Sequence, residues 1–142
     1  MNVLIINHEF PPIGGGGGVF SKLLAAGLAE YGLRTFILTI GNCNSIERLS
    51  ANLSIIRIRV SRNNAVSISD IESLKFIIAS AIRIREIIKE FDIDIVNPHF
   101  IHTSSLANYL SFNNCPAVIS ALGADVYDPT RYLNIRKIMD FT

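Results

Sequence analysis

The chain has 142 residues, which suits one compact domain and is too short for two. Its formal net charge of +1 provides no basic surplus, so nucleic acid is not predicted as a partner. The two cysteines, Cys43 and Cys115, lack the spacing of metal ligands and indicate free thiols in a reducing compartment. Neither a signal peptide nor a membrane span is evident in the pattern, and we therefore expect a cytoplasmic location.

Short apolar runs alternate with longer helical periods along the chain, a pattern typical of a parallel α/β sheet. Strands are predicted at residues 3–6, 35–40, 54–60, 93–97 and 117–120. In the third of these, Arg57 and Arg59 alternate with aliphatic residues, which predicts an edge strand with one wet face. A doubly wound, Rossmann-like sheet with strand order 3-2-1-4-5 follows from these elements.

Helices are predicted between the strands. The first runs from about residue 17 to 31, and Gly32 stands where a left-handed residue commonly ends a helix. Ser69 and Glu72 form a capping box that opens a long helix ending near Phe91. A third helix begins at Thr103 or Ser104 and ends near residue 112, and residues 132–139 form a last amphipathic segment.

The loop after the first predicted strand is rich in glycine. In a doubly wound sheet, ligands bind beyond the carboxyl ends of the strands where the strand order reverses, so residues 8–18 and 98–103 are expected to converge. The helix after the glycines has no side chain to cap its first amides, and uncapped donors at a positive dipole end suit a phosphate. Pro11 and Pro12 stiffen the approach. A ligand site is therefore predicted at Gly14 to Gly18.

Three other interpretations apply to a glycine-rich loop of this kind. A floppy surface loop with surplus glycine is the simplest. A dinucleotide fingerprint is disfavoured because the loop is long and the second strand ends at Thr39-Ile40-Gly41 without an acidic ribose ligand. A Walker phosphate loop is excluded because no Lys-Ser or Lys-Thr follows the glycines.

Three segments in order carry a family resemblance. They are Pro-Pro-Ile and five glycines before a helix with Leu24-Ala25, the stretch Ile95 to His99, and the stretch Val118 to Asp125. Together they resemble glycosyltransferase family 4 over nearly the whole chain. This implies the N-terminal, acceptor-side half of a retaining GT-B enzyme of glycan biosynthesis, which transfers a sugar from a nucleotide-sugar donor to a hydroxyl of a sugar or lipid-linked acceptor. Residues 1–142 are then a single truncated domain, inactive alone, because the nucleotide-sugar domain is absent.

The resemblance also implies roles for particular residues. The amides of Gly15 and Gly16 face the donor diphosphate, and Gly17 opens the helix start. Asp125 accepts hydrogen bonds from the acceptor, or alternatively caps a turn. His99 and Asp125 are the catalytic candidates, and His8 and His99 line the substrate site, although a structural role for His99 is nearly as well supported. No cofactor is expected. A zinc site on the closely spaced His99 and His102 is disfavoured, because the only further candidate ligand is His8 and tetrahedral sites require three or four.

Two positions depart from the family pattern. Leu122 replaces a histidine near the reacting sugar, and Gly18 replaces a glutamate. These departures leave open a catalytically silent partner module of the same fold, and a dinucleotide-binding domain is a more remote alternative. Arg83, Arg85 and Lys89 indicate a solvated helix face, with weak contact to anionic lipid as a further hypothesis.

Overall fold

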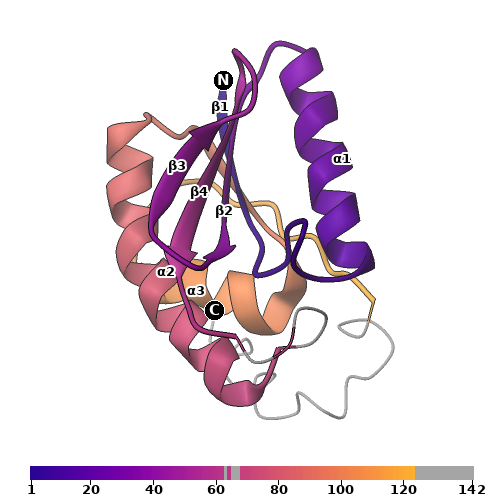
Figure 1. The fold of residues 1–142 in the computed structure, drawn as a ribbon. Helices are drawn as coiled ribbons and strands as arrows, with labels where there is room; N and C mark the ends of the chain where they lie inside the picture. The colour runs from indigo at the N-terminus through magenta and orange to yellow at the C-terminus, as the bar shows by residue number, and fades with distance from the viewer. Residues whose placement is uncertain (63, 65–67, 124–142) are drawn as a thin grey trace.

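The computed structural model describes residues 1–62, 64 and 68–123, and within them the chain forms a single mixed sheet with helices on both sides (Figure 1). The strand order is β3-β4-β2-β1-β5. All neighbouring strands are parallel except β3, which pairs antiparallel with β4. The strands are β1 (Asn2–Ile6), β2 (Arg34–Gly41), β3 (Ser45–Arg48), β4 (Leu53–Arg59) and β5 (Ile95–Pro98). The predicted α/β class and central order are confirmed.

The prediction that residues 54–60 form the sheet edge is wrong. The edge is β3, a four-residue strand that was not predicted and that pairs with β4 from Ser45↔Arg57 to Arg48↔Ser54. The side of β4 that was assigned to water is partly covered as well. The Arg57 guanidinium lies 5.9 Å from the centre of the Phe10 ring and donates to the carbonyl of Pro11. The alternation with arginine therefore marks a face of β4 that a loop covers at Arg57 and that stays exposed at Arg59, not the edge of the sheet.

The predicted fifth strand lies beside β5 at the expected place. Residues 117–120 run parallel to it through isolated bridges, Val96↔Ala117 and His99↔Ser120, rather than a continuous ladder. The backbone amide of Val118 donates to the carbonyl of Val96, and the amide of Ser120 donates to the carbonyl of Pro98, each at 2.9 Å. The predicted segment 132–139 lies outside the described residues.

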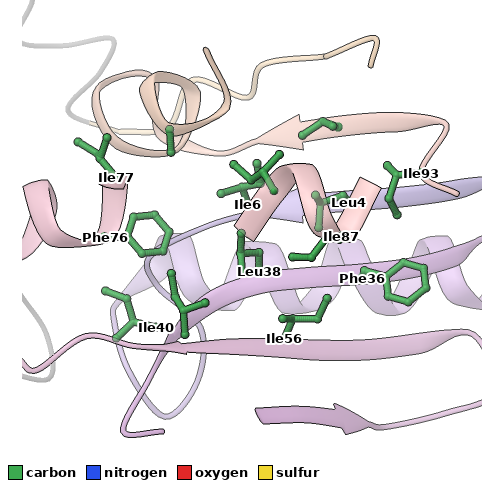
Figure 2. Packing of buried hydrophobic residues seen from close by; sticks show 14 of the residues in the cluster. Leu4, Ile6, Phe36, Leu38, Ile40, Ile56, Phe76, Ile77, Ile87 and Ile93 are labelled. Atoms are coloured by element: carbon green, nitrogen blue, oxygen red, sulfur yellow. The ribbon is translucent and has the colours of Figure 1, made fainter. Parts of the chain in front are cut away.

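Two apolar layers hold the helices on the sheet. Helix α1 (Gly16–Glu30) packs on one face, over Val3, Ile5 and Ile37. Helices α2 (Asp70–Glu90) and α3 (Leu106–Leu110) cover the other face, where Leu4, Ile6, Leu38, Phe76 and Ile87 form the larger cluster (Figure 2). The strands are continuous aliphatic runs because both of their faces are buried.

The ends of the helices follow from local sequence. As predicted, α1 has no side-chain cap at Gly15, and Gly32 follows it with φ +84°. The capping box of α2 is confirmed: the Glu72 amide donates to the Ser69 hydroxyl, and the Glu72 carboxylate accepts from the Ser69 amide at 2.9 Å. Among the described residues, no helix is both long enough and apolar enough to cross a bilayer.

Replacement of the cap residue, Ser69→Ala, is expected to lower the free energy of unfolding by about 1 kcal/mol, because the Glu72 amide loses its acceptor. Urea unfolding followed by circular dichroism measures this loss. Ser73→Ala, one turn further along α2, is the matched control and is expected to be neutral. Equal stability of the two variants would contradict the assigned cap.

The third helix differs from its predicted start. Helical backbone begins at Phe100 as a π-helix (Phe100–Ser105) and continues as α3. Phe100 has φ +69°, an uncommon conformation for a large side chain, and π-helical turns are frequent at functional sites. Pattern alone could not show this wider turn, which brings Phe100 toward the glycine loop.

Candidate functional site

Two loops meet at the carboxyl edge of the sheet, as the sequence predicts. Strands β1 and β5 are neighbours, so the segments that leave them start side by side. The Thr103 hydroxyl is 3.0 Å from His8 Nδ1, and the rings of His8 and Phe100 lie 4.9 Å apart. The ring of Phe20, in α1, lies 5.4 Å from that of His99. We call this region, residues 7–21 and 97–103, the junction.

Glu9 holds the glycine loop in place. Its carboxylate accepts a hydrogen bond from the amide of Gly15 at 3.1 Å, and its own amide donates to the side chain of Asn7 at 2.9 Å. The helix that has no cap of its own therefore has a carboxylate at its amino end, supplied by the loop in front of it. Glu9 was not among the predicted site residues.

The glycines of the loop serve different purposes. Gly14 has φ +98°, and a Cβ there would lie 2.5 Å from the Glu9 Cβ. A Cβ on Gly17 would lie 2.5 Å from Cζ of Phe100. A Cβ on Gly15 or Gly16 would meet no atom within 4 Å. Close packing therefore requires glycine at positions 14 and 17, whereas positions 15 and 16 border open space.

At the start of α1, the described part of the chain leaves two backbone amides without an acceptor. The Gly15 amide is already engaged by Glu9, and the Gly18 amide donates to the Gly15 carbonyl at 3.1 Å. In the part of the chain that the structure describes, the amides of Gly16 and Gly17 have no acceptor, as expected for the first turn of a helix. The amides without an acceptor are thus those of Gly16 and Gly17, whereas the pair predicted to face a diphosphate is Gly15 and Gly16.

His99 lies at the centre of a buried hydrogen-bonded network. Its side chain is fully buried, with Nδ1 2.7 Å from the Ser21 hydroxyl and Nε2 2.9 Å from Asn97 Oδ1. Asn7 Nδ2 donates to the same Ser21 hydroxyl at 2.6 Å. The network joins β1, α1 and β5 under the junction. In this arrangement His99 braces the floor of the junction rather than presenting a ring nitrogen to solvent.

The tautomer of His99 follows from its partners. Asn97 Nδ2 donates to the Ser120 hydroxyl at 2.9 Å, so Asn97 Oδ1 is the acceptor that faces His99. Nε2 of His99 must carry a proton, and Nδ1 of the neutral ring accepts from Ser21. Burial lowers the pKa of His99 from 6.5 to about 4, because the charged ring would lose its hydration. His99 is therefore neutral at physiological pH.

The two other histidines lie close to the ring of Phe100. His8 is buried, 3.8 Å from the Glu9 carboxylate through Nε2, with the Phe76 ring of α2 6.0 Å away. The ring of His102 makes an edge contact with Phe100 at 6.1 Å. Within the described ranges no three metal-ligating side chains come together. Asp125 lies outside the described residues.

Several junction residues were missed by the sequence analysis, namely Asn7, Glu9, Ser21 and Phe100. A signal existed for Ser21, a hydroxyl on the buried face of α1 one turn after the glycines, where an aliphatic residue is otherwise usual. None existed for Phe100, whose position depends on the π-helical turn. Glu9 could have been considered because it is the one carboxylate in the loop.

Two structures of sucrose-phosphate synthase from Thermosynechococcus elongatus share the fold, each with a TM-score of 0.60, at 13% and 16% sequence identity. The match covers 92% of this chain and 67% of the first structure, and 84% of this chain and 32% of the second. The chain thus spans about a third of the longer one. A comparison with curated protein sequences found no match. The shared architecture is the Rossmann-like α/β fold of a GT-B half.

The family is given by a sequence model described as glycosyl transferase 4-like, which matches residues 15–141. This range is nearly the whole chain, and the chain belongs to that family. The resemblance inferred from the glycine loop and the two later segments is confirmed, and the family is one of glycosyltransferases.

Proposed function

We propose that the chain is the acceptor-side half of a retaining glycosyltransferase. It transfers a sugar from a nucleotide-sugar donor to an acceptor hydroxyl in glycan biosynthesis, in the cytoplasm, and depends on a second, nucleotide-binding domain for donor affinity. The observation that carries this proposal is the unobstructed amino end of α1. There, the side-chain positions of Gly15 and Gly16 border free space, and the amides of Gly16 and Gly17 lack acceptors within the described part of the chain.

Fixed amides at a helix start stabilise negative charge as it develops on a leaving group. In the proposed mechanism the Gly16 and Gly17 amides contact the diphosphate of the donor. The Gly15 amide is held by Glu9 and fixes the loop that carries them. No step in this assignment draws on a metal or a cofactor from this half of the enzyme.

The histidines have different proposed roles. His8 borders the loop next to Glu9 and contributes to the wall that faces the substrate. His99, neutral and buried, positions Ser21 and through it the first turn of α1. The assignment of Asp125 to acceptor hydroxyls rests on the family resemblance alone.

The proposal is tested by placing a side chain in the open space. In the enzyme expressed from its whole reading frame, Gly16→Val is expected to lower kcat/KM for glycosyl transfer at least about tenfold, since the isopropyl group takes the ligand's place. Folding is expected to persist because a Cβ at Gly16 meets nothing within 4 Å.

The matched control is Gly27→Val, near the other end of α1, where a Cβ also meets nothing within 4 Å. Valine is a better helix former than glycine, so this replacement carries no helix-propensity cost, and the variant is expected to keep transfer intact. Full activity of Gly16→Val would show that the loop is not a ligand site. Tight binding of NAD in place of a nucleotide sugar would support the dinucleotide-binding alternative. A folded full-length protein without any transfer would support the silent partner module that Leu122 suggests.

A further inference from the structure

The amino edge of the sheet, opposite the junction, carries a small cavity with positively charged walls. Its volume is about 200 Å³, and it lies on the face of the sheet that α2 covers. Arg34, at the start of β2, and Arg48, at the end of β3, both line this cavity, as do Phe36 and Ser54. Phe36 and Phe76 lie at opposite ends of the apolar cluster under α2, and Phe76 is at the junction end (Figure 2).

The strand register places these side chains on one face of the sheet, in adjacent rows. Phe36 of β2 pairs with Ser54 of β4, and Ser54 pairs in turn with Arg48 of β3. Residues directly opposite each other in neighbouring strands project from the same face, with Cβ atoms about 5 Å apart. Arg34 precedes Phe36 by two positions and therefore projects from this face as well. Two arginines thus flank one hydroxyl group.

Both guanidinium groups are held in place by uncharged partners. Arg48 donates from Nε to the carbonyl of Ser50 at 3.1 Å and from Nη2 to the carbonyl of Ala51 at 3.0 Å. The Arg34 guanidinium lies 5.7 Å from the centre of the Phe36 ring. Neither arginine forms an ion pair with a carboxylate in the described part of the chain. Two positive charges therefore share one small cavity, and like charges at this separation repel each other.

A phosphate group matches this arrangement. Arg48 keeps N–H donors beyond the two that hold the turn after β3, and an arginine fork binds phosphate oxygens in pairs. The Ser54 hydroxyl, on the same face, can donate to a further oxygen. The cavity is smaller than the roughly 300–1,000 Å³ of sites that enclose drug-sized ligands, so it suits a phosphate group rather than a whole nucleotide.

We propose that Arg34, Arg48 and Ser54 form a binding site for a phosphate group, separate from the junction. The competing explanation is that Arg48 only braces the turn after β3 and that Arg34 only covers the Phe36 ring. Neither of these structural roles requires the second arginine, whereas an anion between the two converts their repulsion into attraction. The inference does not rest on sugar transfer, and it is tested without a donor.

The test is titration calorimetry of the full-length protein with inorganic phosphate, at an ionic strength held constant with chloride. Phosphate is expected to bind the unmodified protein, and Arg34→Gln is expected to weaken this binding at least about tenfold, because a charge-assisted contact is lost. Folding is expected to persist, since Arg34 is exposed and its guanidinium contacts the Phe36 ring without a hydrogen bond in the described part of the chain. Ser54→Ala is expected to weaken binding about fivefold.

The control is Arg59→Gln, which removes an exposed arginine from the other end of β4. It is expected to bind phosphate like the unmodified protein, and circular dichroism checks that all variants are folded. A parallel titration with methyl phosphate distinguishes the two sources of the group: tighter binding than inorganic phosphate, lost in Arg34→Gln, supports a phosphomonoester, and weaker binding supports free phosphate.

Two results would overturn the proposal. One is the absence of phosphate binding by the unmodified protein, and the other is equal binding by Arg34→Gln. Binding that Gly16→Val removes and Arg34→Gln leaves intact would assign the phosphate to the junction instead.

Discussion

Acidification from pH 7 to pH 4 is expected to lower the free energy of unfolding by about 3 kcal/mol through His99 alone, because one pKa unit corresponds to about 1.4 kcal/mol. Burial lowers the pKa of His99 in the folded protein to about 4, against 6.5 for the free side chain. Between these values the unfolded chain binds a proton that the folded chain excludes. The contribution is therefore fully present above pH 6.5 and is lost as the pH falls toward 4.

Urea unfolding at a series of pH values measures this effect. His99→Gln removes the titrating group, and its stability is expected to vary less with pH over the same window, whatever its absolute value. His102→Gln, which replaces a less buried ring, is the control. Its free energy of unfolding is expected to depend on pH as that of the unmodified protein does. If His99→Gln shows the same slope as the unmodified protein, the neutral, buried assignment of His99 is wrong.

Gly17→Ala is expected to lower the free energy of unfolding by about 2 kcal/mol, since overpacking in a filled site typically costs 1–3 kcal/mol. The new methyl group would lie 2.5 Å from Cζ of Phe100 and 3.1 Å from the Glu9 carboxylate, so Phe100 has to move. Phe100 already has φ +69° and begins the π-helix, which limits the adjustments open to it.

The matched variant is the neighbouring Gly16→Ala, where the methyl group points into open space. Alanine is preferred to glycine in a helix by about 0.5–1 kcal/mol, so this variant is expected to be at least as stable as the unmodified protein. Thermal or urea unfolding of both variants provides the comparison. Equal effects at positions 16 and 17 would mean that Phe100 does not pack on the loop as described.

The sequence allowed the frame of the fold to be predicted, for physical reasons. Aliphatic runs such as residues 3–6 are too apolar for anything but a strand buried on both faces, and Ser69 with Glu72 defines a helix start locally. Strand β3 was missed because a four-residue segment containing one aliphatic side chain, Ile46, carries no periodic signal. The pairing of β3 with β4 depends on the tertiary fold, so the local sequence pattern does not predict it.

The candidate site was predictable in location but not in detail. The rule that ligands bind where strand order reverses was enough to bring residues 8–18 and 98–103 together. The hydrogen-bond partners of each site residue could not be predicted, because they come from distant segments of the chain. The contact between Ser21 and His99 is an example. The sequence could not show that Glu9 would engage Gly15, which moves the free amides to Gly16 and Gly17.

The central position of β1 has a consequence for how the chain folds during synthesis. This strand is made before β2 and β5, yet one of its two edges pairs with β5, and the Asn2 amide donates to the Asp94 carboxylate at 2.6 Å. That edge stays unpaired until more than ninety further residues have been made. Closing so long a loop is entropically costly and slow, so an incomplete chain exposes an aliphatic strand that a chaperone or another nascent chain can bind.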